Sequence, residues 1–410
     1  MTAELIPPPD LTFADTRRSS LKQLEAFIPR ASKYGRDRNH VVPGHTNVSR
    51  LSPAIRHRLL LESECAEAPR TRYAASTVEK FTQEIYWRRY WKAWLSLRPQ
   101  VWTSYLEELE HWRTDHETLE RANACEEGRS RIAIMNHFAN ELIKTGYLHN
   151  HARMWFAGWW IHIERLPWQL GADFFFRHLL DGDPASNTLS WRWVAGLQTP
   201  GKTYLPRRSN LEKYLTPEVL EKHAEGLELL EKPTPQQPEA VTKPAVTRPS
   251  LEDSDAPSDG PIALWLHEED LLTEQGPLSS LKPHHIIAAG NRAGWKEHRF
   301  APGKIEWLER AIQDGARRSE EHFETSAEVD TRRPLAESLT QWANDHRGGQ
   351  IVALRPEVGP LHDQLPDLRT KLRELDVSLR LVDRPEDLDL RPLATGGFFN
   401  FWKKFQASRD

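Results

Sequence analysis

Apolar residues recur at spacings of three and four through residues 20–220 of this 410-residue chain, which is the periodicity of one helix face. The pattern is clearest in residues 77–97, 131–145 and 151–165, and the alternation typical of a half-buried strand is scarce throughout. The sequence therefore predicts an all-helical domain, which we place at residues 1–230.

The hydrophobic pattern stops in residues 231–260. This stretch is rich in proline and contains no aromatic residue. Such a composition favours an extended chain over a packed core. We therefore predict a linker here, and a domain boundary within it.

Short apolar runs separated by amphipathic stretches fill residues 261–410. The runs are residues 262–266, 286–289, 351–354 and 377–382, and they have the length of buried parallel strands. Residues 304–317 and 335–345 have the pattern of crossover helices. We predict a Rossmann-like α/β domain with a parallel sheet, although no Walker or GxGxxG loop marks a nucleotide site in it.

The composition narrows the class of protein. With 28% charged and 38% hydrophobic residues and a net charge of −4, the chain is typical of a globular protein and shows no overall signature of a polyanion-binding protein. Residues 1–230 hold 31 Lys and Arg against 28 Asp and Glu, so a local phosphate-binding face remains compatible with the sequence. Sixteen tryptophans are unusual, and eleven of them precede residue 200; a large helical core is the simplest explanation for them.

The scarcity of cysteines and of long apolar runs indicates the cellular compartment. Two cysteines, Cys65 and Cys125, are too few for a disulfide scaffold or a four-cysteine cluster. No apolar run has the length of a membrane span, and the N-terminus lacks the pattern of a signal peptide. We expect a cytoplasmic monomer with no membrane partner.

Two motifs near the N-terminus carry candidate chemistry. Tyr34 and Arg38 precede a Val-Ser-Arg-Leu-Ser-Pro run at residues 48–53, where hydroxyls, amides and a guanidinium could form a diphosphate cradle; an ordinary helix start explains the run equally well. Further on, Glu84 shares one helix face with Trp87 and Arg88. An exposed ion pair beside a buried indole is the alternative there.

Two further motifs follow. His149 and His151 lie at a spacing of two, without the i, i+4 geometry or the further ligands of a metal site, so we expect no metal. Between and after them stand Asn150, Arg153, Met154 and a run of tryptophans, which core packing would also explain. The last motif comprises Asp181, Asp183, Asn187, Trp191 and Trp193. By itself it fits a polar helix cap or a hydrolase dyad.

Taken together and in this order, the four motifs resemble the flavin-binding core of the DNA photolyase and cryptochrome family. The resemblance implies a helical domain that binds FAD. It implies that FAD phosphates contact Tyr34, Arg38 and the residues Val48, Ser49, Leu51 and Ser52. Val48 replaces the threonine usual in the family, so Thr46 or Asn47 would have to supply that contact.

The resemblance also implies a pocket for an extruded DNA lesion. Glu84 would contact the lesion, Trp87 would stack on it, and Arg88 would face the flavin. Asn150 and Met154 would touch flavin-side and lesion-side groups, with Arg153 near the flavin. Because enzymes specific for the (6-4) photoproduct carry a histidine pair in this segment, Asn150 and Met154 favour the cyclobutane pyrimidine dimer.

The fourth motif completes the implied site. Asp181 and Asp183 would lie on the adenine–ribose and ring edges of FAD, and Asn187 would face flavin N5. Trp191 would be the electron donor nearest the ring, and Trp193 would form the second wall of the base pocket.

Electron transfer in the family runs through three tryptophans, and this chain matches them only in part. Trp168 corresponds to the middle one. Asp115 stands at the spacing of the outer one, with Trp112 three residues away, and Cys125 replaces another usual tryptophan.

The order of the domains departs from the family, in which an α/β antenna domain usually comes first. Residues 261–266 resemble the family's opening strand, and residues 397–404 (GFFNFWKK) resemble the segment that closes its antenna domain. We therefore interpret the chain as circularly permuted. A second, antenna chromophore of unknown identity fits this interpretation, but no residue for it is recognisable.

The resemblance implies light-driven repair of cyclobutane dimers in single- or double-stranded DNA, by electron transfer from reduced FAD to an extruded lesion. A cryptochrome-like photoreceptor without repair is the main alternative, and the end of the chain at Asp410, shortly after the α/β region, favours repair. A DNA-binding protein with an idle flavin and a flavin oxidoreductase are two others, the last lacking a Rossmann fingerprint for a hydride donor.

Overall fold

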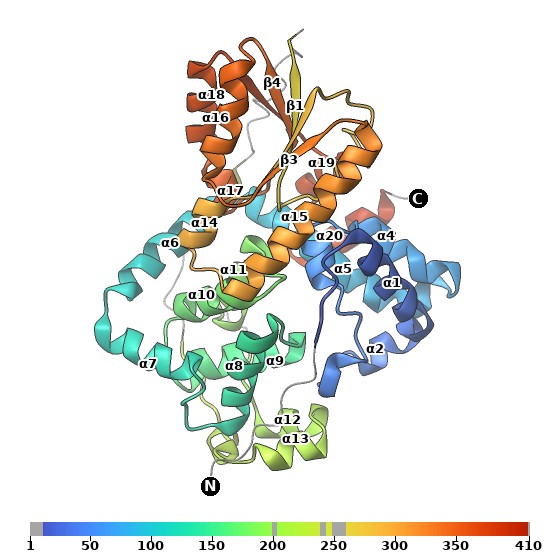
Figure 1. Cartoon of the computed structure of the whole chain (residues 1–410). Coiled ribbons are helices and arrows are strands. Elements are labelled where there is room, and N and C mark those ends of the chain that lie inside the picture. The colour runs from blue at the N-terminus through green and yellow to red at the C-terminus, as the bar shows by residue number, and fades with distance from the viewer. Residues whose placement is uncertain (1–10, 199–202, 238–242, 248–259, 409–410) are drawn as a thin grey trace.

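The computed structural model describes residues 11–198, 203–237, 243–247 and 260–408. Figure 1 shows a helical region with a five-stranded α/β region packed against it. The helices of the first region are α1 (Arg17–Phe27), α2 (Tyr34–Asp37), α3 (Ser52–Arg56), α4 (Glu62–Glu67), α5 (Ala75–Ser96), α6 (Gln100–Arg113), α7 (His116–Glu126), α8 (Ala133–Thr145), α9 (Asn150–His162), α10 (Trp168–His178), α11 (Pro184–Val194), α12 (Arg208–Tyr214) and α13 (Pro217–Lys222).

Local sequence sets where the functional helices begin. The amide of His151 donates a hydrogen bond to Nδ1 of His149, which caps the start of α9. The amide of Ser186 donates to the carboxylate of Asp183, and Pro184 occupies the first turn of α11. The predicted helices at residues 77–97, 131–145 and 151–165 are confirmed as α5, α8 and α9.

The second region contains a parallel sheet in the order β3-β2-β1-β4-β5. Its strands are β1 (Ile262–Leu266), β2 (His285–Ala289), β3 (Ala327–Asp330), β4 (Gln350–Leu354) and β5 (Ser378–Val382). Its helices are α14 (Arg292–Glu297), α15 (Pro302–Phe323), α16 (Leu335–Asp345), α17 (Pro360–Asp363), α18 (Leu365–Glu374), α19 (Pro385–Leu390) and α20 (Phe398–Ala407). In Figure 1, α16 and α18 cover one face of the sheet and α15 runs across the other.

The four predicted strands and the two predicted crossover helices are confirmed, and with them the fold class. Strand β3 is missing from the sequence-based prediction. Of its four residues, Ala-Glu-Val-Asp, only Asp330 is buried, because β3 pairs with β2 alone at the edge of the sheet. An edge strand of this kind has no continuous apolar run to reveal it.

The two regions share one hydrophobic core. It extends from the helical region through residues of α15 to the aromatic face of α20, including Trp307, Phe398 and Phe401. The described parts of the predicted linker, residues 231–237 and 243–247, contain neither helix nor strand. The amide of Thr247 donates to the carbonyl of Leu97, so part of this stretch lies against the helical region.

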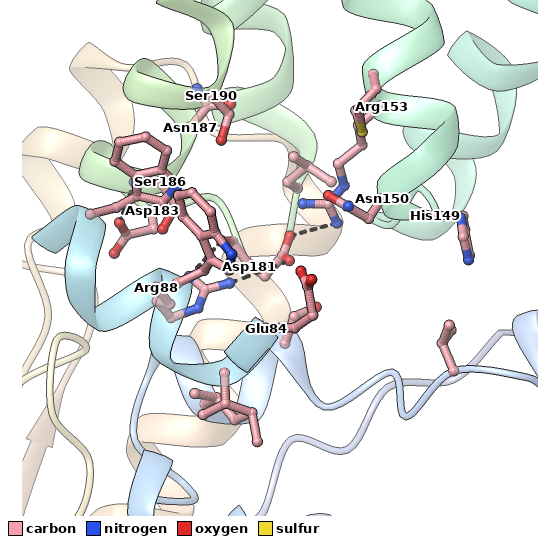
Figure 2. Close-up of a pocket in the computed structure, with 18 of the residues that line it drawn as sticks. Glu84, Arg88, His149, Asn150, Arg153, Asp181, Asp183, Ser186, Asn187 and Ser190 are labelled. Carbon is pink, nitrogen blue, oxygen red and sulfur yellow. Dashed lines mark hydrogen bonds and ion pairs between the residues drawn. The ribbon is translucent and has the colours of Figure 1, made fainter. Parts of the chain in front are cut away.

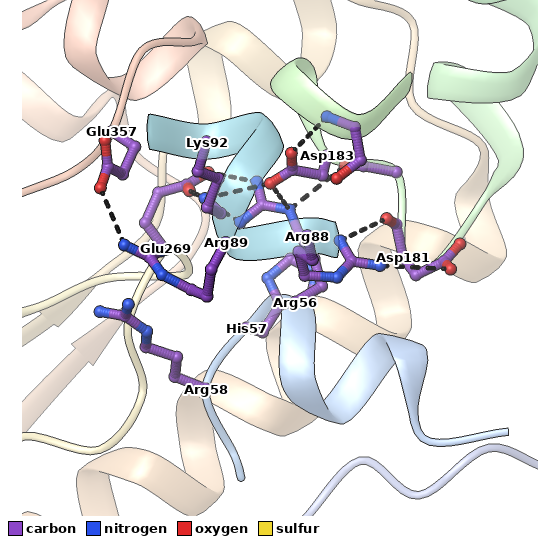
Figure 3. Close-up of polar contacts among 12 residues, drawn as sticks. Arg56, His57, Arg58, Arg88, Arg89, Lys92, Asp181, Asp183, Glu269 and Glu357 are labelled. Atoms are coloured by element: carbon purple, nitrogen blue, oxygen red, sulfur yellow. Dashed lines mark hydrogen bonds and ion pairs between the residues drawn. The ribbon is translucent and has the colours of Figure 1, made fainter. Parts of the chain in front are cut away.

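A dense set of ion pairs joins the two regions (Figure 3). Arg58 donates to Asp270 at 2.9 Å and to Asp387 at 2.7 Å, and Arg89 contacts Asp387 at 2.5 Å. All of these side chains are largely buried, so each charge depends on its partner. Among the described residues, no helix combines the length and the apolar character needed to cross a bilayer.

Candidate FAD and base pocket

A pocket of about 670 Å³ opens between α2, α5, α9, α10, α11 and the start of α20. This volume lies in the range of roughly 300–1,000 Å³ that is typical of small-molecule and cofactor sites. Figure 2 shows polar side chains of three chain segments, from α5, α9 and α11, pointing toward one another across it.

The structure brings nearly all of the predicted site residues to this pocket. Those that line it are Tyr34, Arg38, Val48, Ser49, Leu51, Ser52, Glu84, Trp87, Arg88, Asn150, Arg153, Met154, Asp181, Asp183, Asn187, Trp191 and Trp193. Trp168 does not line it: this side chain is buried against Tyr105, with ring centroids 5.4 Å apart. Neither Thr46 nor Asn47 lines the pocket. The amide of Asn47 instead donates to the carbonyls of Asp37 and His40.

One carboxylate and two guanidiniums form the polar floor of the pocket. Asp181 accepts a hydrogen bond from Arg153 at 3.0 Å, and Arg88 lies 3.6 Å from its other oxygen. Burial acts to raise the pKa of Asp181, but Arg153 and Arg88 outweigh it and leave the pKa below its ordinary value. Asp181 is therefore an anion held between two cations.

The carboxylate of Asp183 belongs to a buried cluster of charged side chains that come from both regions (Figure 3). Lys92 lies 3.0 Å and Arg56 3.3 Å from its carboxylate, and the same two cations contact Glu269, which follows β1. Burial opposes ionisation, but Lys92 and Arg56 hold the pKa of Asp183 well below its ordinary value. They also lower the pKa of Glu269 to about 2, with Arg56 the stronger. The α/β region thus helps to fix a carboxylate in the pocket.

Glu84 of α5 adds a further carboxylate to the pocket lining (Figure 2). Arg38 lies 3.0 Å from its carboxylate, and both side chains are partly exposed. Burial nevertheless raises the pKa of Glu84, and Arg38 offsets this only in part. Such a carboxylate takes up a proton more readily than an exposed one.

Aromatic rings form the remaining walls. Trp87 stacks on Phe398 of α20, with ring centroids 3.8 Å apart and planes 10° apart, and Trp91 lies 5.3 Å from Trp87. Trp191 is buried, whereas Trp193 is partly exposed at the pocket rim. Flat aromatic faces and directed polar groups therefore line the same pocket.

The residues present fit a flavin nucleotide. Ser186 Oγ and His149 Nε2 are buried atoms of pocket residues that form neither a hydrogen bond nor an ion pair within the described part of the chain. Buried polar groups are rarely left unpaired, so both atoms are suited to bind a ligand. The cations Arg38, Arg88 and Arg153 fit the negative charge of a diphosphate.

The described residues contain no group of three or more His, Cys, Asp and Glu side chains placed to hold a metal ion. The ring of His151 contacts the carbonyl of Asn39 and the side chains of Tyr204 and Asn210.

Sequence reasoning missed several residues of this site: Arg56, Trp91, Lys92, Glu269, Phe398 and Phe399. Lys92 lies one helical turn after Arg88, and Arg56 lies one turn after Ser52, so helical spacing alone could have identified both. Glu269 and Phe398 follow the linker, and no local pattern connects them with residues of α3 or α5.

Comparisons with known proteins match the helical part of the chain that contributes most of this pocket. Residues 81–216 match the family model described as the FAD binding domain of DNA photolyase. The curated deoxyribodipyrimidine photo-lyase of Streptomyces griseus is 30% identical over 152 residues, which are 37% of this chain and 32% of that protein. The Escherichia coli protein of the same name is 25% identical over 206 residues, 47% of this chain and 42% of that one. The chain thus spans about a third to two fifths of the length of these relatives.

Among solved structures, a class III photolyase from Agrobacterium tumefaciens matches with a TM-score of 0.42 and 22% identity, over 53% of this chain and 52% of that chain. An archaeal photolyase from Sulfolobus tokodaii, described with two FAD molecules, matches with a TM-score of 0.39 and 26% identity, over 48% and 44% of the two chains.

Proposed function

We propose that the protein repairs cyclobutane pyrimidine dimers in DNA with the energy of light, and the match of residues 81–216 to the FAD binding domain of DNA photolyase supports this. The observation that carries the proposal is the pocket itself. It gathers carboxylates, guanidiniums and indoles from segments that are far apart in the sequence, in one cavity of cofactor size.

We propose that FAD occupies the polar side of this pocket. Tyr34, Arg38 and the segment Val48–Ser52, with Ser49, Leu51 and Ser52, would hold its phosphates. Asp181 and Asp183 would bind the adenine–ribose and ring edges, Arg88 and Arg153 would balance the charge near the ring, and Asn187 would face N5. Reduced FAD, when bound, supplies an excited electron after absorbing blue or near-ultraviolet light.

The chain's own contribution on this side is fixed charge. Because Asp181 is ionised between two guanidiniums, the site needs little reorganisation when charge moves nearby. Lys92 and Arg56 hold Asp183 in the same way. Buried Trp191 stands at the pocket wall, and we propose that it and Trp168 lie on the route by which the flavin is reduced.

The apolar side would accept the dimer. Trp87 and Trp193 offer flat faces for stacking, and stacking of this kind contributes roughly 1–3 kcal/mol per base, which offsets part of the extrusion cost. A damaged pair is already weakened, so extruding a dimer costs less than extruding intact bases. Glu84, with its raised pKa, would hydrogen-bond the lesion, and Asn150 and Met154 would contact it from α9.

The order of the regions belongs to the same proposal. We infer that residues 261–410 correspond to the family's antenna domain in a permuted position, and that residues 231–260 form the connection. The ion pairs of Figure 3 support this inference, since they pack the sheet region directly behind the flavin side of the pocket.

The first test is cofactor and substrate binding in the dark. We expect the purified protein to carry about one FAD per chain, and to bind an oligonucleotide with a single thymine dimer at least tenfold more tightly than the undamaged sequence. Preparations without flavin, or equal affinity for both oligonucleotides, would refute the proposal.

A further inference from the structure

An exposed phenylalanine stands at the mouth of the pocket. Phe399 lies in the first turn of α20, is 70% exposed and lines the pocket together with Trp87 and Trp91. A ring so exposed contributes little to the core, and it is the most exposed large hydrophobic side chain of the described residues.

The helix that carries Phe399 is firmly held. Its buried face consists of Phe398, Phe401, Trp402 and Phe405, and Phe398 stacks on Trp87 with ring centroids 3.8 Å apart. The amino end of α20 follows Gly396, whose carbonyl accepts a hydrogen bond from Tyr90 of α5 at 2.8 Å. Phe399 is therefore a ring on a rigid support.

The exposed face of α20 carries cations beyond this ring. Lys403 lies one turn after Phe399, and Lys404 one turn after Asn400, and all of these side chains are exposed. Within the part of the chain that the structure describes, neither lysine forms an ion pair. Proteins bind single-stranded nucleic acid with this combination, because bases stack on the aromatic ring and the cations attract the phosphates.

We propose that α20 contacts the DNA strand beside the lesion: Phe399 stacks on a base flanking the dimer, and Lys403 and Lys404 bind phosphates of the same strand. The inference rests on the proposed function, because extrusion of a dimer into the pocket brings its neighbouring bases to the mouth. It adds a DNA-contacting element from the α/β region, whereas the predicted substrate residues all belong to the helical region.

Phe399→Ala tests the stacking contact, with Leu388→Ala on α19 as a matched control, since Leu388 is 42% exposed and does not line the pocket. We expect Phe399→Ala to weaken binding of a dimer-containing oligonucleotide about tenfold, Phe399→Trp to restore it, and Leu388→Ala to leave it unchanged. On an oligonucleotide with an abasic site beside the dimer, the wild type should already show this loss and Phe399→Ala should add nothing. The proposal would be overturned if the losses of affinity caused by the abasic site and by Phe399→Ala multiplied, or if Phe399→Ala bound the dimer as tightly as the wild type does.

The double variant Lys403→Gln, Lys404→Gln should lower the slope of log affinity against log salt by about two, while Lys371→Gln, which removes an exposed lysine of α18, should not change it. An unchanged slope would contradict the phosphate contacts. Undamaged single-stranded DNA distinguishes failure of the α20 proposal from failure of the repair proposal. If the wild type binds damaged and undamaged strands equally well but Phe399→Ala still weakens single-strand binding, the proposed repair function fails and the α20 contact stands.

Discussion

Individual residues of this pocket divide into those that hold charge and those that offer a flat face. Asp181 and Asp183 remain ionised although buried, because each lies against two cations. Trp87 presents one face to Phe398. The motifs identified these residues in the sequence, but not their surroundings: Glu269, which shares Lys92 and Arg56 with Asp183, and Phe398, which stacks on Trp87, approach them only in the folded chain.

Replacing Trp87 tests this division at the residue scale. We expect Trp87→Ala to weaken dark binding of a thymine-dimer oligonucleotide about tenfold, since it removes a stacking face but no polar contact. The FAD content of the protein should remain nearly unchanged. Fluorescence anisotropy with labelled DNA and absorbance of the released flavin measure the two quantities.

Trp112→Ala is the matched control, because Trp112 is likewise partly buried but does not line the pocket. Loss of flavin from Trp87→Ala would show that this residue supports the cofactor side instead.

At the scale of elements, the sequence predicts where the helices and strands lie better than it predicts which of them pack together. Four strands and the pocket helices α5 and α9 follow from hydrophobic spacing, whereas β3 lacks an apolar run. Helix packing depends on close approaches that the pattern does not reveal. Gly171 of α10 is one of these, since a Cβ there would collide with the Trp191 ring of α11.

Gly171→Ala should therefore lower the free energy of unfolding by about 1–3 kcal/mol, the cost of overfilling a packed core, and displace Trp191. Urea unfolding followed by far-UV circular dichroism measures the first effect, and flavin binding reports the second.

Gly303→Ala on α15 provides the comparison, because a Cβ at Gly303 meets nothing within 4 Å. This variant should be as stable as the wild type or slightly more stable, since alanine favours a helix over glycine. Equal effects of the two substitutions would contradict the close packing of α10 on α11.

At the scale of the whole molecule, buried ion pairs bind the α/β region to the helical region. Arg89 of α5 is 1% exposed and contacts Asp387 of α19 at 2.5 Å. Their separation in sequence explains why no motif indicated the contact. The shared core and these pairs predict that the two regions unfold together.

Arg89→Met should lower the free energy of unfolding by about 3–5 kcal/mol, because it leaves the Asp387 carboxylate buried with one cation fewer. Arg208→Met removes an exposed arginine from a surface pair with Glu212 and should change the stability little. Chemical denaturation measures the stability of both variants. Two separate unfolding transitions in Arg89→Met would show that this contact is the main one that holds the two regions together. Similar stability of the two variants would contradict the account.

Stability should also fall in mild acid. Burial lowers the pKa of His298, which packs against Trp102 and Phe176, to about 4. Above the ordinary histidine pKa of about 6.5 neither state is protonated; below it the unfolded chain takes up a proton that the folded chain refuses, so stability falls as pH falls.

Between pH 7 and pH 5.5 this residue should contribute about 1.2 kcal/mol of the loss. His298→Gln should therefore lose about that much less than the wild type over the same interval in urea titrations. An identical loss in both proteins would show that His298 is protonated in the folded state.

The most direct test of the central claim is light-dependent repair. Reduced protein is mixed with an oligonucleotide that contains one thymine dimer, as a single strand and as a duplex, and the remaining dimer is measured after blue light and after an equal time in the dark. The account predicts loss of the dimer and recovery of intact thymines in light only. An unchanged dimer under illumination, in protein that carries stoichiometric FAD, would contradict it and favour a photoreceptor.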